Sequence, residues 1–185
     1  MEKIKHLFFI ALLPPKEVQQ SVINFQNYFG QIYNSSSAKK SPPHLTLQPP
    51  FRWNFPELPL LEEKLQEFAL TQCGVPIILN GFGAFKPRVI YINVVKTPEL
   101  MFLQEQLKTM FKSQFNIEDK QYRNQIFTPH ITVAFRDLTR DNFYKAWPEF
   151  KQKELHFRFT VPQLTLLHHN GERWEIIKEF QLPLN

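Results

Sequence analysis

The sequence predicts an α+β fold in which one unit occurs twice within a single domain covering residues 1–185. Strand-like and helix-like runs alternate along the chain. The pattern Pro-His-apolar-Thr-apolar also occurs twice, around His44 and His130, which lie 86 positions apart. The distance from each histidine to the next predicted hairpin turn is similar, 42 positions to Lys86 and 40 to Asn170. These repeats predict an internal duplication into two pseudo-symmetric lobes.

The first half of the chain begins with a strand-like apolar run. Apolar residues then recur at helical spacing from Val18 to Phe29, and Gly30 predicts the end of that helix. Two later apolar runs separated by Lys86-Pro87 predict a hairpin. The expected elements, in chain order, are a strand at 7–13, a helix at 16–29, a loop at 34–43, a strand at 43–48, a helix at 58–70 and strands at 75–85 and 88–95.

The second half repeats this order of signals. Thr97 is a good N-cap, and the proline after it favours the first helical position. Thr139 is the N-cap of a second short helix, and Asn170-Gly171 predicts a type I′ hairpin turn. The expected elements are a helix with an apolar stripe from 100 to 110, a strand at 129–135, a helix at 139–147 and strands at 156–167 and 173–182.

Composition argues against several classes of protein. Cys73 is the only cysteine, so neither an intrachain disulfide nor a thiolate metal cluster can form. The chain has only five glycines and no HExxH motif, P-loop or dinucleotide-binding pattern, so we expect neither a metal nor a cofactor. No apolar run approaches the roughly 20 residues of a membrane span, and we expect a soluble cytoplasmic protein.

The charge favours a small anionic ligand. The formal net charge is +5, and the basic residues are spread along the chain without a long single-sign block. Proteins that coat a nucleic-acid duplex usually carry a denser basic stripe. We therefore expect contact with one or a few phosphates.

The polar side chains of the repeated motif fall on one face of each predicted strand. Because side chains alternate along a strand, His44 and Thr46 share one face while the apolar residues beside them occupy the other. His130 and Thr132 are arranged in the same way. Either segment alone is compatible with an ordinary solvent-exposed strand. The pair inside a duplicated frame instead predicts that all four side chains converge on one cleft, with the imidazoles as general acid and base and the hydroxyls as donors to phosphoryl oxygens.

These motifs resemble those of the 2H phosphoesterase superfamily, specifically its 2′-5′ RNA ligase-like branch. They stand here as the H-x-T-x sequences "HLTL" and "HITV", and the similarity extends to "FFIALLPP", "GFGAFKPRVIYINV" and "FTPHITVAF". The resemblance implies a bilobal, duplicated α+β fold, with two antiparallel sheets facing a central cleft and helices packed on the outside. One difference is Gln125, where many relatives carry an arginine five positions before the second motif histidine.

The resemblance also implies an activity. It is metal-independent opening of 2′,3′-cyclic phosphate ends to 2′-phosphates, or reversible joining of RNA through 2′-5′ linkages. The partners would be RNA ends or nucleotides, and no obligate protein partner is inferred. By carry-over, His44, Thr46, His130 and Thr132 are the catalytic residues. Our assignment makes His44 the acid and His130 the base, although the motif spacing is symmetric.

Six residues near the motifs are candidates for substrate binding. Phe51 and Trp53 could stack a nucleobase, but core or rim positions are nearly as plausible in a chain with 19 phenylalanines. Phe127 lies just before the second motif. Arginine side chains could balance phosphate charge or serve solubility alone, and the candidates are Arg52, Arg123 and Arg136.

Two alternatives to a nucleotide phosphodiesterase remain open. The first is an RNA- or nucleotide-binding module that keeps the cleft but performs little chemistry. The second is a phosphodiesterase for another class of substrate, because the motifs recognise a phosphoryl group and not what is attached to it.

Overall fold

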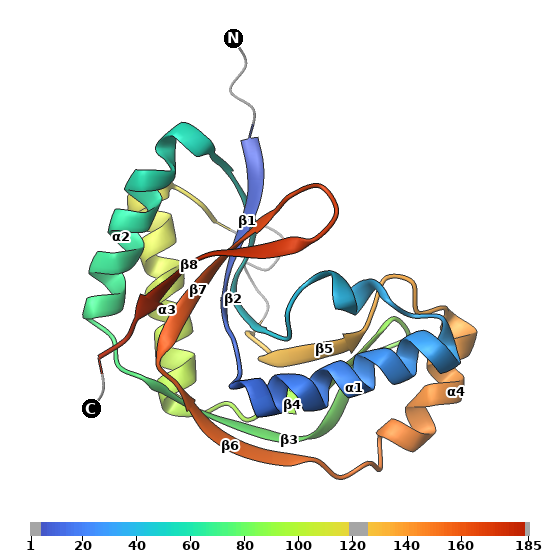
Figure 1. Cartoon of the computed structure of the whole chain (residues 1–185). Coiled ribbons are helices and arrows are strands. Elements are labelled where there is room, and N and C mark those ends of the chain that lie inside the picture. The colour runs from blue at the N-terminus through green and yellow to red at the C-terminus, as the bar shows by residue number, and fades with distance from the viewer. Residues whose placement is uncertain (1–4, 119–125, 184–185) are drawn as a thin grey trace.

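A computed structural model describes residues 5–118 and 126–183 of the chain. The fold is α+β, as predicted, with a curled antiparallel sheet and helices against it (Figure 1). The strands are β1 (Lys5–Leu12), β2 (Leu45–Asn54), β3 (Val75–Phe85), β4 (Val89–Val94), β5 (His130–Ala134), β6 (His156–Val161), β7 (Gln163–His169) and β8 (Trp174–Gln181). The helices are α1 (Lys16–Tyr33), α2 (Leu58–Leu70), α3 (Pro98–Phe115) and α4 (Arg140–Phe150), with short 3₁₀ turns η1 (Ser37–Lys40) and η2 (Phe55–Glu57).

The two expected sheets are joined into one. The strand order is β6-β3-β4-β5-β2-β1-β7-β8, with antiparallel pairing throughout. Four strands on each side form the two halves, and their connection is the pair Leu45↔Ile131 between β2 and β5. Among the described residues this is the one ladder pair between the halves, and it lies within the two motifs. The two sheets of the sequence analysis are therefore two halves of one curled sheet.

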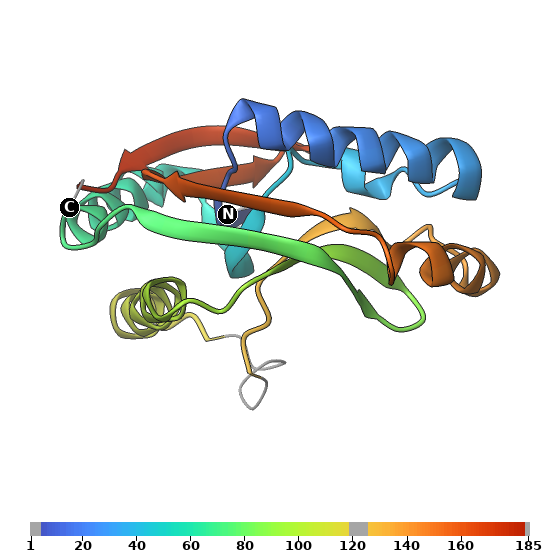
Figure 2. The ribbon, with the colours of Figure 1, turned by 90° about the horizontal axis from the view of Figure 1, so that it is seen from below.

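Helices cover each half of the sheet. α1 contacts β5 and α4 contacts β4, whereas α2 contacts β8 and α3 contacts β2 and β3. Figure 1 shows α2 and α3 together at one end and α1 and α4 at the other. β6 pairs along its whole length with the first part of β3, and the two strands run side by side between the two ends (Figure 2). Within the described ranges, no helix is both long and apolar enough to span a membrane.

One large apolar core lies between the sheet and the helices. It contains Leu45 and Leu47 of β2 together with Ile131 and Val133 of β5, all at most 2% exposed. A smaller cluster of Phe9, Ala11 and Leu167 is separate from this core. Because neighbouring residues of a strand point to opposite faces, the core side chains direct the polar motif residues to the other face of the sheet.

Several sequence predictions differ in detail from the structure. The strand expected at 43–48 begins at Leu45 and continues to Asn54. α1 continues past Gly30 to Tyr33, and a Cβ at Gly30 would lie 2.9 Å from Ser36 Oγ, so glycine permits close approach of the next loop. The run at 156–167 is interrupted at Pro162, which separates β6 from β7. The predicted type I′ turn at Asn170-Gly171 is wrong. Of these two residues only Gly171 has a positive φ, and the β7–β8 loop spans four residues, 170–173.

The element order around the two motif strands is similar. β1 is followed by α1 and then by β2, which pairs antiparallel with β1 and leads into α2. β4 is followed by α3 and then by β5, which pairs antiparallel with β4 and leads into α4. The duplication into two pseudo-symmetric lobes stays a prediction, and this order is consistent with it.

Candidate active site

The two repeated motifs lie on neighbouring strands. Their five residues have the same burial pattern in both copies: the proline is buried, the histidine half-buried, the next residue buried, the threonine half-buried and the last residue buried. In an antiparallel register centred on Leu45↔Ile131, the position of His44 faces that of Thr132, and the position of Thr46 faces that of His130. Each histidine therefore belongs beside the threonine of the other motif, on the face turned away from the core.

The backbone orients both imidazole rings in the same way. His44 Nδ1 lies 2.7 Å from the carbonyl oxygen of Pro42, and His130 Nδ1 lies 2.7 Å from that of Thr128. A carbonyl oxygen can only accept, so Nδ1 of each ring carries the proton and donates it. Nε2 of each ring forms no hydrogen bond with another described residue, and it is the nitrogen left to exchange a proton with a ligand.

Aromatic rings pack against both histidines. The Phe9 ring centroid lies 4.8 Å from that of His44. The Phe85 and Tyr91 rings lie 5.1 Å and 5.0 Å from that of His130. These contacts restrict rotation of the imidazoles and replace water on one side of each ring. Phe85 is 41% exposed, so part of its ring also stays accessible beside His130.

Burial makes both histidines hard to protonate. It lowers the pKa of His44 to about 4, against the opposing effect of the hydrogen bond to Pro42, and repulsion from His130 lowers it further. The pKa of His130 is also lowered by burial, partly offset by the hydrogen bond to Thr128. The two rings are close enough to interact electrostatically. In the free protein near neutral pH both are therefore neutral, with an unprotonated Nε2.

The structure places Phe51 and Trp53 away from the motif face, which corrects their proposed role in stacking a base. Phe51 is 5% exposed and packs in the core against Phe8 and Phe111. Trp53 is half-buried and its ring lies 5.0 Å from that of Phe115. Packing against other aromatic rings therefore accounts for the positions of both side chains.

Arg52 is exposed but far along its strand from the motif. It lies eight positions from His44, which at about 3.3 Å per residue is roughly 25 Å. This separation along the strand places Arg52 away from the motif histidines. Its contact with substrate stays a prediction.

The remaining binding candidates lie near the second motif. Phe127 is half-buried and packs against the main core, which accounts for its side chain. Arg136 is exposed, has a φ of 60° and places its guanidinium 5.1 Å from the centroid of the Phe135 ring. Its contact with substrate stays a prediction. Arg123 and Gln125 lie outside the described residues.

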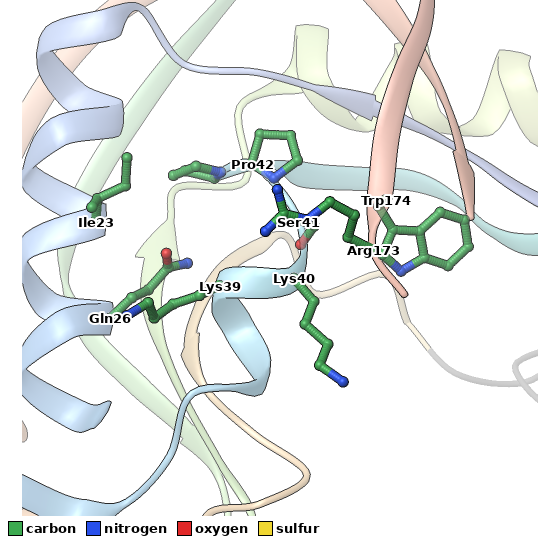
Figure 3. Close-up of a pocket in the computed structure, with 9 residues that line it drawn as sticks. Ile23, Gln26, Lys39, Lys40, Ser41, Pro42, Arg173 and Trp174 are labelled. Carbon is green, nitrogen blue, oxygen red and sulfur yellow. The ribbon is translucent and has the colours of Figure 1, made fainter. Parts of the chain in front are cut away.

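A cavity beside the first motif contains residues that the sequence analysis did not select. Its volume is about 300 Å³, and α1, η1 and the β7–β8 loop surround it (Figure 3). Its lining includes Gln26, Lys39, Pro42, Arg173 and Trp174. The sequence feature that could have indicated this cavity is the pair Lys39-Lys40 in the loop that leads to the first motif. The loop pattern alone did not show which surface these lysines face. Within the described ranges, no group of three or more His, Cys, Asp or Glu side chains could hold a metal ion.

Hydrogen bonds to Asp137 anchor the loop that precedes the first motif. One carboxylate oxygen accepts from the Ser35 hydroxyl, and the other accepts from the backbone N–H groups of Ser36 and Ser37. Burial raises the pKa of Asp137, but these hydrogen bonds outweigh it and hold the pKa below its ordinary value. Asp137 follows β5 closely, so it connects the exit of the second motif strand to the approach of the first.

The chain is similar to known sequences over most of its length. The sequence model of the 2′-5′ RNA ligase superfamily matches residues 14–173. A Geobacillus kaustophilus protein named "Putative phosphoesterase" is 30% identical over 178 residues, covering 92% of this chain and 93% of its own length. A relative of the same name from Bacillus cytotoxicus is 27% identical over 176 residues, covering 94% of this chain and 95% of its own.

Solved structures share the fold. TT0787 of Thermus thermophilus aligns with a TM-score of 0.71 at 20% identity, covering 97% of this chain and 98% of its own. E. coli LigT, solved in complex with 3′-AMP, aligns with a TM-score of 0.70 at 19% identity, covering 97% of this chain and 99% of its own. At these identities the likeness establishes the fold alone.

Proposed function

The chain belongs to the 2′-5′ RNA ligase superfamily, and we propose that it is a phosphodiesterase that acts on RNA or nucleotide ends. The proposed reaction opens a 2′,3′-cyclic phosphate to a 2′-phosphate with water as the nucleophile. With a ribose hydroxyl as the nucleophile, the same chemistry would join RNA through a 2′-5′ linkage. The LigT complex with 3′-AMP supports a nucleotide as the ligand of this fold.

The observation that carries the proposal is the matched orientation of the two imidazoles. Both rings donate through Nδ1 to a carbonyl two residues earlier, and both leave Nε2 for a ligand. The motif strands are adjacent, so one phosphorus atom could lie between the two Nε2 atoms. In-line displacement at phosphorus needs a base on the attacking side and an acid on the leaving side.

The proton transfers then follow from this arrangement. The neutral Nε2 of one ring accepts a proton from water while the water oxygen forms a bond to phosphorus. The Nε2–H of the other ring, protonated once the anionic substrate is bound, donates to the ribose oxygen as its bond to phosphorus breaks. The hydroxyls of Thr46 and Thr132 donate to the non-bridging oxygens, where negative charge builds up in the transition state.

The pKa values leave the choice of the acid open. Burial lowers the pKa of both rings, that of His44 to about 4. The symmetric spacing of the motifs does not distinguish the rings either. We keep His44 as the proposed acid and His130 as the proposed base.

A substrate with sulfur as the leaving atom separates the two roles. A thiolate leaves without a proton, so replacing the departing 3′-oxygen of the cyclic phosphate by sulfur makes the acid dispensable. We expect His44→Ala to regain most of its lost rate on this substrate while His130→Ala does not. Rescue of His130→Ala alone would reverse the assignment, and rescue of neither variant would contradict acid catalysis by these rings. The measurement is steady-state kinetics of both variants on the oxygen and sulfur substrates.

Histidine replacement tests the proposed function itself. We expect His44→Ala and His130→Ala each to reduce kcat for a 2′,3′-cyclic nucleotide by roughly 10²-fold or more, because each variant removes one proton transfer. His156→Ala is the matched control, since His156 is exposed at the start of β6, outside the motifs. Chromatography of the products measures turnover, and circular dichroism shows whether each variant is folded.

Two outcomes would contradict this function. Full activity of either motif variant would remove the two-histidine mechanism. Binding of cyclic nucleotides without product, across pH and substrate length, would instead identify a binding module.

A further inference from the structure

We infer that the cavity beside His44 binds the phosphate of the nucleotide that precedes the reacting end, so that the preferred substrate is an RNA oligonucleotide. This inference rests on the proposed function, because it takes the reacting phosphate to lie between the motif histidines. It adds a second phosphate subsite to that function and favours RNA ends over mononucleotides as the substrate.

The charge of the cavity favours an anion. Lys39 comes from η1 and Arg173 from the β7–β8 loop, and both are exposed. Figure 3 shows Lys39 extending toward α1 and Arg173 extending toward Pro42, whereas Lys40 points away. In the part of the chain that the structure describes, neither Lys39 nor Arg173 forms an ion pair with a carboxylate. Two uncompensated cations on a concave surface attract a phosphate and can donate charge-assisted hydrogen bonds to it.

The cavity borders the first motif and is connected to the second through one hydrogen bond. Pro42 lines it, and the Pro42 carbonyl accepts the hydrogen bond that orients His44. Gln26 also lines it, is 3% exposed and donates through Nε2 to the backbone carbonyl of Thr132. A group bound in the cavity is therefore adjacent to the proposed reacting phosphate. A cyclic mononucleotide has no second phosphate to place there, whereas an RNA strand does.

The backbone that carries Lys39 is held in place before any ligand binds. Ala38, next to it in η1, is 4% exposed and anchors the turn in the protein interior. Asp137 holds the chain at the start of η1 through three hydrogen bonds. On the other side, Asn170 accepts from the backbone N–H of Arg173 through its side chain. A preformed site loses less conformational entropy on binding than a flexible one, which favours a specific subsite.

Two substrates that differ only in the preceding nucleotides test the inference. We compare 2′,3′-cyclic AMP with a trinucleotide that ends in the same cyclic nucleotide. For Lys39→Gln/Arg173→Gln we expect KM for the trinucleotide to rise about tenfold or more with kcat retained, because contacts with one phosphate are lost. We expect kcat/KM for cyclic AMP to change by less than about twofold. The dependence of KM on salt should also weaken for the trinucleotide alone.

The control variant removes the same charge elsewhere. Lys64→Gln/Lys108→Gln also lowers the net charge by two, on the outer helices α2 and α3. We expect it to leave KM for both substrates unchanged. An equal rise in KM for both substrates in the cavity variant would overturn the inference. So would a similar rise for the trinucleotide in the control variant, since that would indicate general electrostatic attraction.

A binding measurement keeps this test independent of turnover. Fluorescence anisotropy of a labelled trinucleotide ending in a 2′-phosphate measures the subsite even if no substrate is hydrolysed. We expect the cavity variant to bind it about tenfold more weakly than the unmodified protein and the control variant to bind it equally well. If the cavity variant binds more weakly but the unmodified protein hydrolyses no substrate, the proposed function alone is contradicted. If the unmodified protein hydrolyses its substrate but both proteins bind the trinucleotide equally well, the subsite alone is contradicted.

Discussion

Each motif histidine depends on a carbonyl group two residues before it. The hydrogen bond from Nδ1 to that carbonyl selects the tautomer with a free Nε2, and nearby rings hold the imidazole in place. Pro42 and Thr128 therefore contribute through their backbone. This explains why the motif begins with a proline that favours extended backbone in the preceding residue.

The lowered pKa values predict the pH dependence of turnover. The base must be neutral, so kcat/KM rises with pH through the pKa of that ring. The acid must be protonated, so kcat/KM falls as pH rises through the pKa of the other ring. Because both pKa values are lowered, that of His44 to about 4, we expect the kcat/KM optimum on the acidic side of the ordinary histidine pKa of about 6.5.

The profile of kcat should differ in a defined direction. A bound phosphate anion favours the protonated imidazole and raises both pKa values, so we expect the kcat optimum at higher pH than the kcat/KM optimum. Steady-state kinetics with 2′,3′-cyclic AMP over the range in which the protein stays folded measures both. A kcat/KM optimum well above neutrality would contradict the burial of these rings.

At the scale of elements, the loop between α1 and β2 connects the two motifs and the cavity. It contains η1, and Asp137 from the segment after β5 holds its first residues. Sequence patterns predicted a loop here, and the structure shows that a carboxylate about 100 positions later determines its path. Hydrogen bonds between distant segments have no local periodicity, so they could not be predicted from one sequence.

Replacing Asp137 tests this role. We expect Asp137→Asn to lower the free energy of unfolding by about 1 kcal/mol, since two backbone N–H groups lose a carboxylate partner that is partly screened by solvent. The pKa of Asp137 is lowered in the folded protein, so its stabilisation is present above the ordinary aspartate pKa of about 3.9. It is lost as pH falls through the folded value. The difference in urea stability between the two proteins should therefore shrink in acid.

The KM values of Asp137→Asn provide a second measurement of this role. A displaced loop moves Lys39, so KM for the trinucleotide should rise more than KM for cyclic AMP. Glu154→Gln is the matched control, because Glu154 is an exposed carboxylate in the segment before β6. Equal stability of Asp137→Asn and the unmodified protein at neutral pH would show that these hydrogen bonds do not hold the loop.

At the scale of the whole molecule, the curled sheet brings the two motifs together. In the part of the chain that the structure describes, Leu45 and Ile131 form the one ladder pair between the two halves, and each is 1% exposed. Their burial in the core directs His44 and His130 to the opposite face. The active-site candidates therefore lie at the junction of two four-stranded units, where neither unit alone would form the site.

Local patterns in the sequence were sufficient to predict most of the elements, the α+β class and the four motif residues on one face of their strands. Alternation and helical periodicity are properties of neighbouring residues, so they are readable without coordinates. Only the tertiary structure decided that β2 and β5 are neighbours, that Phe51 and Trp53 belong to packed interiors, and that Lys39 and Arg173 surround one cavity. Those outcomes depend on contacts between segments far apart in the chain, and one sequence carries no local signal for such contacts.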